Sequence, residues 1–346
     1  MIERESLLTY LRERFGDVCI KRFERLGAGV HGTGFSLVIE TGGREREYVV
    51  KDLAPEGLGH DYPSDRAAVL LLAYDEYGNL PKHIRAVDVV ALTEDGSVRS
   101  VSGGKEYFLV MEKAEGTNYF SDLEEMKDKA VLSDMDRKKI QAMAGYLKEI
   151  HSVKKESKTL YRRKIRDTIG HGECLMGVFD SYPDGVVGYD TMAEIEKLCV
   201  DWRARLKPFH GRLCQIHGDF HPGNIWFRGD DFVLLDRSRG PWGDGADDIT
   251  AMTINYIFYS IMYHDSVTGA YREALELFYE RYIELTGDRE ILSVVAPFYA
   301  FRGAVVAHPV FYPQLGGKQR IKVFSFMRNV LLSERFEPER VNDLLV

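Results

Sequence analysis

The sequence predicts an α+β protein of two lobes, a small β-rich N-terminal lobe and a larger, mainly helical C-terminal lobe. At 346 residues the chain is longer than one typical domain and can bury a substantial core. Strand-like patterns occupy most of the sequence between residues 19 and 111, whereas helical patterns dominate after Glu112. The boundary between the lobes is therefore expected near residue 112, giving lobes 1–112 and 113–346.

Composition excludes several classes of protein. Hydrophobic residues make up 45% and charged residues 29%, as in an ordinary soluble protein. The net charge of -8 and a pI near 5.8 argue against binding to nucleic acid. The acidic N-terminal segment and the lack of an apolar run of about 20 residues predict neither a signal peptide nor a membrane span. The four cysteines contain no C-x-x-C pair. A cytoplasmic protein without a zinc site or disulfide framework is expected.

The N-terminal lobe is expected to combine one helix over residues 1–15 with several strands. A second helix is predicted to start near Ser64, a plausible N-cap. A polar turn over Glu94–Lys105 is expected to separate the last two strands. The predicted strand segments are Arg22–Leu26, Phe35–Glu40, Tyr48–Leu53, Val87–Leu92 and Tyr107–Met111.

The C-terminal lobe is expected to be helical apart from one segment. Ser133 is predicted to cap a helix that runs to His151, because apolar residues recur there at helical spacing. Residues 190–207 and 245–287 are further helical segments. The exception is Leu213–Asp236, which has the pattern of β-structure.

Three oxygen-bearing side chains are predicted to meet at one end of this β segment. Residues 224–227 and 232–235 form a predicted hairpin, and pairing about its turn places Asn224 beside Asp236. Asp219 lies just upstream, on a loop rich in glycine and proline. Amide and carboxylate oxygens suit Mg²⁺ bound together with substrate phosphates, and phosphoryl transfer needs a carboxylate to orient the acceptor hydroxyl. Taken singly, each of these residues is also an ordinary turn former.

Two histidines, His217 and His221, flank this aspartate four residues apart. A zinc pair on a helix has the same spacing, but the intervening and following glycine and proline residues disfavour a helix, and no third ligand is evident. We expect His217 to be a buried histidine whose hydrogen bonds shape the loop. For His221, a structural role and a position facing phosphates are both open.

The pattern His217-Gly218-Asp219-x-x-x-x-Asn224, followed by Asp236, resembles the catalytic and metal-binding loops of the aminoglycoside phosphotransferase family. That family has the protein-kinase-like fold and includes choline and methylthioribose kinases. The resemblance implies that Asp219 is the catalytic base and that Asn224 and Asp236 hold Mg²⁺. It also implies that Asp248 is an internal brace of the loop. The match continues through Arg239, Gly243-Asp244 and Asp248-Ile249, and Leu147–His151 resembles the helix end that precedes the family's substrate-binding insertion.

The N-terminal lobe supplies a glycine cluster and a lysine for the same comparison. Gly27 and Gly29 lie between two strand signals, where backbone amides can approach phosphates, although a hairpin turn uses glycine too. Lys51 lies in the apolar run Tyr48–Leu53, where an unpaired ammonium is costly to bury. The resemblance implies that Lys51 holds the nucleotide phosphates; an edge-strand lysine that faces water is the alternative.

Two further assignments follow from the resemblance. The family pairs this lysine with an acidic residue of the next helix, usually glutamate; here Asp65 is the best match and is one methylene shorter. The segment after Tyr107–Met111 resembles the hinge between lobes, where the backbone of Glu112 and Ala114 would bind the adenine edge.

The expected activity is transfer of the γ-phosphate of ATP, or of GTP, with Mg²⁺ to a hydroxyl of a small molecule. A protein-modifying kinase and a non-catalytic nucleotide-binding pseudokinase are the alternatives. The insertion over residues 155–200 carries a basic cluster, Tyr161–Arg166, which favours a sugar, nucleoside or amino alcohol over an aminoglycoside antibiotic. Arg302, His308 and Tyr312 are the C-terminal candidates for an acceptor pocket.

Overall fold

The computed structural model describes residues 4–29, 32–55, 58–76, 79, 84–106, 109 and 111–346. The chain divides into two compact units, Met1–Met111 and Glu112–Val346, called unit 1 and unit 2 below. Unit 1 contains a three-stranded sheet, and unit 2 consists mostly of helices. The predicted α+β class, with a small β-rich part followed by a larger helical part, is therefore confirmed.

Unit 1 is built on an antiparallel sheet in the order β1-β2-β3, and α1 packs on it. The turn between β2 and β3 contains Gly42 and Gly43, both with the positive φ that glycine adopts readily. A small apolar core forms between the helix and the sheet, with Leu7, Leu11 and Ile39 almost completely buried. The elements of unit 1 are α1 (Arg4–Phe15), β1 (Val18–Gly29), β2 (Gly32–Thr41), β3 (Arg44–Lys51), α2 (Pro63–Glu76), β4 (Val90–Leu92) and β5 (Val98–Ser100).

Two details of unit 1 differ from the sequence prediction, and a third prediction falls largely outside the described residues. The turn predicted over Glu94–Lys105 is wrong in its middle, because β5 lies there and pairs with β4; Val98 is the buried residue that fixes this strand among polar neighbours. Helix α2 begins before Ser64, so Ser64 is not its N-cap, and the Asp65 carboxylate accepts a hydrogen bond from Tyr62 N instead (2.7 Å). The predicted strand Tyr107–Met111 includes Tyr107, Phe108 and Val110, which lie outside the described residues.

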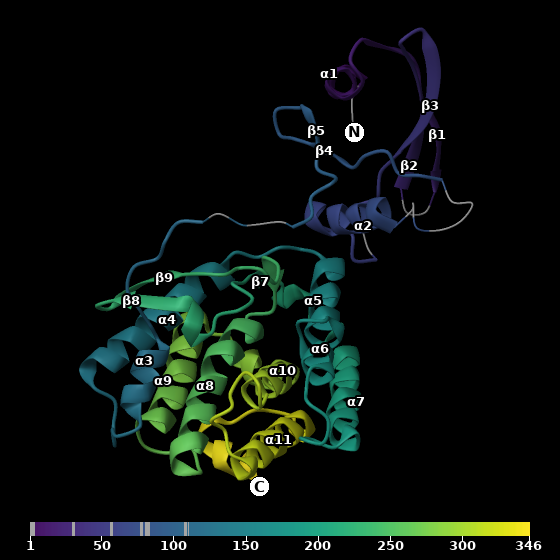
Figure 1. Ribbon diagram of the computed structural model, residues 1–346. Coiled ribbons are helices and arrows are strands. Elements are labelled where there is room, and N and C mark those ends of the chain that lie inside the picture. Colours follow the sequence, from purple (N-terminus) through teal and green to yellow (C-terminus); the bar gives the residue numbers. More distant parts are fainter. Residues whose placement is uncertain are drawn as a thin grey trace. The chain divides into compact units, whose positions relative to one another are not determined.

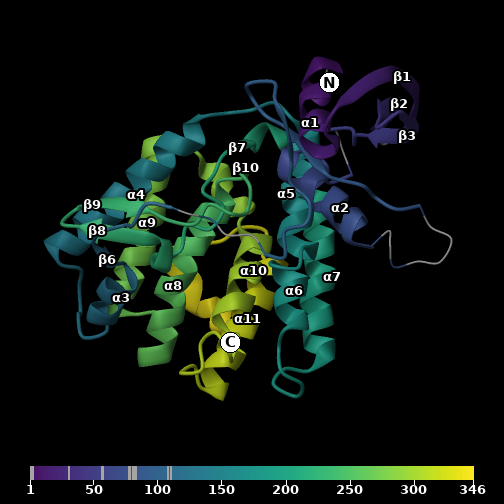
Figure 2. The same ribbon diagram turned by 45° about the horizontal axis from the view of Figure 1, so that its top comes forward.

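Two helices of unit 2, α8 and α10, are buried, and the other helices of the unit pack around them (Figures 1 and 2). Both views show α5, α6 and α7 along one side of this pair and α3, α4 and α9 along the other. Helix α8 is buried on every side from Ala246 to Ile261, including the two aspartates of its first turn. The helices are α3 (Phe120–Met126), α4 (Asp134–Ser152), α5 (Lys158–Gly170), α6 (Leu175–Asp180), α7 (Tyr189–Leu206), α8 (Ala246–His264), α9 (Gly269–Thr286), α10 (Ala296–Val306) and α11 (Gly317–Leu332).

The segment predicted as helical over residues 245–287 forms two helices, α8 and α9. Asp265 ends α8 in a left-handed conformation (φ 64°), and Gly269 begins α9. Short 3-10 helices complete unit 2: η2 (His210–Arg212), η3 (Pro222–Asn224), η4 (Arg289–Ser293) and η5 (Pro338–Leu345).

Short strands in unit 2 carry the predicted catalytic segment. They form one sheet in the order β6-β8-β9 and a separate pair β10-β7. Hairpin β8–β9 pairs Ile225 with Leu234 and Arg228 with Asp231, so its turn is the two residues Gly229 and Asp230. The strands are β6 (Thr117–Asn118), β7 (Cys214–Gln215), β8 (Ile225–Arg228), β9 (Asp231–Leu234) and β10 (Trp242–Gly243).

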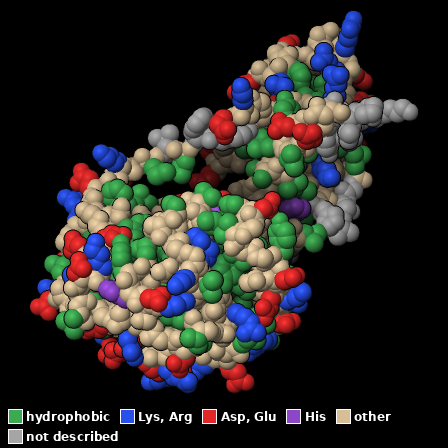
Figure 3. Space-filling model, turned by 60° about the horizontal axis from the view of Figure 1, so that its bottom comes forward, with side chains coloured by type: hydrophobic (Ala, Val, Ile, Leu, Met, Phe, Trp, Pro, Cys, Tyr) green, Lys and Arg blue, Asp and Glu red, His purple; other side chains and the backbone are tan. Residues whose placement is uncertain are grey.

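The exposed side chains show no large region of one charge on the face drawn in Figure 3, where Lys and Arg alternate with Asp and Glu. Among the helices of the described ranges, none has both the length and the apolar character that crossing a bilayer requires.

Ser133 caps helix α4 as predicted, and the structure shows a full capping box with Asp136. Ser133 Oγ accepts a hydrogen bond from Asp136 N (3.2 Å), and Ser133 N donates to Asp136 Oδ2 (2.8 Å). We expect Ser133→Ala to lower the free energy of unfolding of unit 2 by about 1 kcal/mol, because the first turn of the helix loses an acceptor. All three tryptophans, Trp202, Trp226 and Trp242, lie in unit 2, so their fluorescence during urea unfolding measures this change.

The matched control is Ser152→Ala at the exposed C-terminal end of the same helix, where the hydroxyl donates only to Glu149 O. We expect a change within about 0.5 kcal/mol for this control. Equal losses in the two variants would contradict the capping role of Ser133.

Candidate active site

The loop from Ile216 to Asn224 is held against the segment that follows the β8–β9 hairpin. Arg237 donates from Nε (3.0 Å) and Nη2 (2.9 Å) to Ile216 O, and Ile216 N donates to Pro241 O (3.0 Å). Gly218 then turns the chain with φ 85°, and a side chain there would lie 3.3 Å from Gly240 O. The loop therefore requires glycine at this position.

Asp248, fully buried in the first turn of α8, binds the backbone of the loop. Its Oδ2 accepts from His217 N (2.8 Å), and its Oδ1 accepts from Gly218 N (2.7 Å). His151 at the end of α4 places Nε2 3.1 Å from Asp248 Oδ2, and its Nδ1 lies 2.9 Å from Tyr282 OH on α9. The expectation that Asp248 is an internal brace of this loop is thus confirmed.

Asp219, the predicted catalytic base, is buried beside two guanidinium groups. Arg302 on α10 donates from Nη1 to Asp219 Oδ1 (2.5 Å), and Arg239 Nη1 lies 3.5 Å from the same oxygen. Burial by itself would raise the pKa of Asp219, but Arg302, Arg239 and His221 outweigh it and hold the pKa below its usual range. The side chain is therefore a carboxylate near neutral pH, and only Oδ1 is bonded to Arg302.

A second carboxylate, Asp247, completes a buried network of charges. Arg302 Nη2 donates to Asp247 Oδ1 (2.8 Å) and to Gly218 O (3.0 Å). Lys164 on α5 places Nζ 2.7 Å from Asp247 Oδ2. Burial opposes ionisation of Asp247, yet Lys164 and Arg302 lower its pKa to about 2. The network joins the predicted insertion, the catalytic loop, α8 and α10.

The two predicted metal ligands, Asn224 and Asp236, lie at the open end of the hairpin. They are not directly opposite each other. The two-residue turn places Asn224 opposite Leu235, whose N donates to Asn224 O (3.0 Å), so the prediction that Asn224 and Asp236 pair directly is wrong by one residue. Asn224 Nδ2 donates to Asp219 O (3.0 Å). Asp236 is exposed and adopts φ 52°, a left-handed conformation that aspartate tolerates better than most residues. Metal binding by this pair stays a prediction.

Both histidines make hydrogen bonds within the loop. His217 is buried and its Nδ1 accepts from Asp219 N (3.3 Å), which confirms the loop-shaping role. His221 Nδ1 accepts from Gly223 N (3.1 Å), so a neutral ring carries its proton on Nε2, 3.9 Å from Asp219 Oδ2. Burial lowers the pKa of His221 and favours the neutral ring. In the described ranges no three His, Cys, Asp or Glu side chains form a group able to hold a metal.

The predicted nucleotide-binding residues of unit 1 lie at the ends of strands and at a helix start. In the β1–β2 pair Gly27 lies opposite Gly34 and Gly29 opposite Gly32; Val30 and His31 of the glycine cluster lie outside the described residues. Lys51 ends β3, pairs with Gly34 and is exposed, so it is not buried as its apolar neighbours suggested.

No ion pair joins Lys51 to Asp65 in the described part of unit 1, and Asp65 instead contacts the start of its own helix. Glu112 and Ala114 belong to an irregular segment at the start of unit 2. The nucleotide contacts of all these residues stay predictions.

Sequence reasoning missed Asp247 and the part that Lys164 plays. Lys164 belongs to the predicted basic cluster, but it lies on the buried face of α5 with Tyr161, Ile165 and Thr168. A lysine on the apolar face of a helix is the signal that predicts a buried partner. Arg302 was one of three C-terminal candidates for the acceptor pocket, and it is the one that contacts Asp219.

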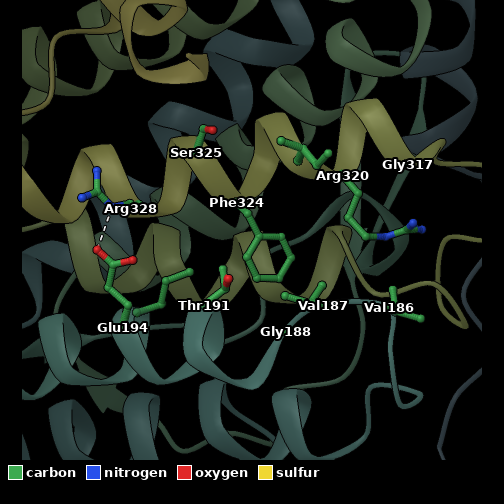
Figure 4. A pocket seen from close by; sticks show the side chains of 12 residues that line it. Val186, Val187, Gly188, Thr191, Glu194, Gly317, Arg320, Phe324, Ser325 and Arg328 are labelled. Carbon is green, nitrogen blue, oxygen red and sulfur yellow. Dashed lines mark hydrogen bonds and ion pairs between the residues drawn. The ribbon is translucent and has the colours of Figure 1, made fainter.

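A separate cavity of about 570 Å³ lies between α7 and α11 (Figure 4). Phe324 and Arg320 line it from α11, and Val187 and Glu194 line it from the other side. Arg328 closes one end through an ion pair with Glu194 (2.7 Å). None of its lining residues belongs to the catalytic loop.

The buried Asp247 network predicts a loss of stability in acid. Because the folded-state pKa of Asp247 is lowered from 3.8 to about 2, the unfolded chain takes up a proton first as the pH falls. The stabilisation is complete above about pH 4 and is lost toward pH 2, a difference of roughly 2–3 kcal/mol. We expect tryptophan-monitored urea unfolding to show a steeper fall over this range in the wild type than in Asp247→Asn.

The matched control is Asp265→Asn, which removes a surface carboxylate paired with Lys322 (2.9 Å) and keeps a residue suited to positive φ. We expect its stability to follow the wild-type pH dependence. An Asp247→Asn variant that also follows the wild type would refute the assignment of the acid-sensitive group.

Comparisons with solved structures find distant similarities that span nearly the whole chain. A thermostable mutant of the aminoglycoside phosphotransferase APH(4)-Ia is 15% identical and aligns over 91% of this chain and 97% of its own, with a TM-score of 0.36. Amicoumacin kinase in complex with AMP-PNP, Ca²⁺ and the ligand named Ami is 14% identical and aligns over 93% of this chain and 92% of its own, with a TM-score of 0.43. An ethanolamine kinase of Plasmodium vivax is 14% identical and aligns over 94% of this chain and 80% of its own, with a TM-score of 0.34. None of the curated proteins compared with the chain matches it.

The family comparison covers most of both units. The sequence model described as the phosphotransferase enzyme family matches residues 23–282, which is more than half of the chain and includes the whole catalytic loop and the brace at Asp248. This chain belongs to the phosphotransferase enzyme family.

Proposed function

We propose that the protein is a small-molecule kinase that transfers the γ-phosphate of ATP, with Mg²⁺, to a hydroxyl group. The observation that supports this most directly is the state of Asp219. Arg302 bonds one oxygen of its carboxylate and leaves Oδ2 for an acceptor hydroxyl, while Asn224 bonds the backbone of the same residue. The family membership of the chain supports the same reaction class.

The proposed role of Asp219 is to orient the hydroxyl and to accept its proton at Oδ2. Phosphoryl transfer passes through a loose transition state, so the position of the acceptor matters more than the strength of the base. A carboxylate whose pKa is held low by Arg302 and Arg239 suits this role, because it stays ionised and fixed. Arg302 acts as a positioning residue in this mechanism.

Asn224 and Asp236 are proposed to hold Mg²⁺. The Asn224 amide nitrogen is committed to Asp219 O, which leaves its oxygen as the ligand, and Asp236 is exposed at the same end of the hairpin. Two protein oxygens fit Mg²⁺, which keeps waters and substrate phosphates as its other ligands. When bound, the ion would neutralise charge on the phosphates.

In unit 1 we propose that Lys51 and the backbone near Gly27 and Gly29 bind the nucleotide phosphates. The exposed ammonium at the end of β3 supports this, because it lies on the described surface without a competing ion pair. Asp65 is the proposed acidic partner of Lys51. The backbone of Glu112 and Ala114 is proposed to bind the base. ATP is the proposed phosphate donor, and GTP is the second donor to be tested.

The test compares Asp219→Ala with the wild type in a coupled ADP-release screen over sugars, nucleosides, amino alcohols, hydroxy acids and aminoglycosides. We expect the wild type to turn over at least one acceptor and the variant to lose roughly 10³-fold or more in kcat, because the hydroxyl is no longer oriented. Affinity for Mg-AMP-PNP, measured by calorimetry, should remain within about threefold.

Asp230→Ala is the matched control, since it removes an exposed carboxylate from the turn of the same hairpin. It should behave as the wild type in both measurements. Wild-type turnover by Asp219→Ala would refute the mechanism. Nucleotide binding without turnover of any acceptor would favour a pseudokinase, and phosphorylated protein in a lysate assay would favour a protein kinase.

A further inference from the structure

We propose that the acceptor carries an acidic group, a carboxylate or a phosphate, and that Arg239 binds it. This inference rests on the proposed function and names the chemical class of its substrate. Arg239 lies three residues after the proposed metal ligand Asp236, and its Nη1 lies 3.5 Å from Asp219 Oδ1. It is therefore placed beside the carboxylate whose other oxygen, Oδ2, would receive the proton of the acceptor hydroxyl.

The guanidinium of Arg239 is held in place but incompletely bonded. Its Cζ lies 5.4 Å from the centre of the Phe301 ring, and its backbone oxygen accepts a hydrogen bond from Lys164 Nζ (3.3 Å). Within the described chain, Nη1 is buried and makes no hydrogen bond. The carboxylate oxygen paired with it, Asp219 Oδ1, is 3.5 Å away and is already bonded by Arg302. A buried donor without a hydrogen bond is costly, and an anionic ligand that binds this guanidinium would reduce the cost.

The other two cations of the network have their charges neutralised at close range. Arg302 bonds both Asp219 and Asp247, and Lys164 lies 2.7 Å from Asp247. Among the described residues, Arg239 has only the 3.5 Å ion pair with Asp219 Oδ1, an oxygen that Arg302 already bonds, so its positive charge is the least neutralised of the three. A planar guanidinium is the group best suited to bind a carboxylate or phosphate through paired hydrogen bonds.

The same charge distribution disfavours a cationic acceptor. Arg302 and Arg239 both lie against Asp219 Oδ1, at 2.5 and 3.5 Å. A protonated amine that approached Asp219 would meet the same two guanidinium groups, and like charges at such distances repel. Alcohols that bear an acid, such as hydroxy acids or sugar phosphates, fit this surrounding better than amino alcohols or aminoglycosides.

One competing role for Arg239 is to contact the phosphoryl group in transit rather than the acceptor. That role would make Arg239 equally important for every acceptor and for the nucleotide. An acceptor-binding role instead predicts an effect confined to acidic acceptors. The two roles are therefore separated by comparing acceptors that differ only in charge.

The experiment measures binding by calorimetry in the presence of Mg-AMP-PNP, so that it does not depend on turnover. The probes are matched series: glycerol, glycerate and glycerol 3-phosphate; ribose, ribonate and ribose 5-phosphate; glucose, gluconate, glucose 6-phosphate and glucosamine. We expect the wild type to bind at least one acidic member at least tenfold more tightly than its neutral or amine counterpart. Comparing the affinities of the carboxylate probes with those of the phosphate probes shows which acidic group is preferred.

Arg239→Met should weaken binding of that acidic probe by roughly ten- to a hundredfold and leave the neutral probe and AMP-PNP within about twofold. The matched control is Arg205→Met, which removes another arginine stacked on an aromatic ring, Trp202, at 3.9 Å on α7. It should leave all affinities unchanged.

The proposal is overturned if no acidic probe binds the wild type more tightly than its counterparts. It is also overturned if Arg239→Met weakens neutral probes or AMP-PNP as much as acidic ones. A different result would contradict the proposed function alone. In that case an acidic probe binds in an Arg239-dependent way, but no acceptor is phosphorylated with ATP or GTP.

Discussion

The buried guanidinium of Arg302 is the group on which the arrangement of the candidate site depends. It lies between Asp219 and Asp247 and also contacts the backbone of Gly218. Two carboxylates in an apolar interior repel each other and lose hydration, and the shared cation offsets both costs together with Lys164 at Asp247 and Arg239 at Asp219. Arg302 therefore fixes where the loop lies, which oxygen of Asp219 remains available and how α10 approaches α8.

The candidate site is assembled from segments far apart in the sequence. Lys164 comes from α5, Asp247 from α8 and Arg302 from α10, while Asp248 connects the loop to the end of α4 through His151. Each contact is buried and directional. A buried polar network of this kind is stabilising only when each member has its partner, so its parts depend on one another. Two nitrogens of the described network, Arg239 Nη1 and Arg302 Nε, are buried without a hydrogen bond, but Arg302 bonds two carboxylates through its other nitrogens and Arg239 does not.

Local features of the sequence predicted most of the fold and the identity of the loop. The capping box at Ser133, the hairpin after Asn224 and the glycine turn at Gly218 depend on neighbouring residues, which a sequence displays directly. The strand at Val98 was missed because one apolar residue among polar ones gives no alternating pattern. The contact of Arg302 with Asp219 was not predicted, since 83 residues separate the two and no local pattern shows which charges meet.

The position of Lys164 has a consequence for how enzymes of this kind can diverge. The insertion that contains α5 is the part expected to vary with the acceptor, yet one of its lysines neutralises a carboxylate beneath the catalytic loop. A foreign insertion without a cation at this position would leave Asp247 with a single partner. The insertion is therefore not an independent module, and recombination between relatives must carry Lys164 and Asp247 together to preserve the loop.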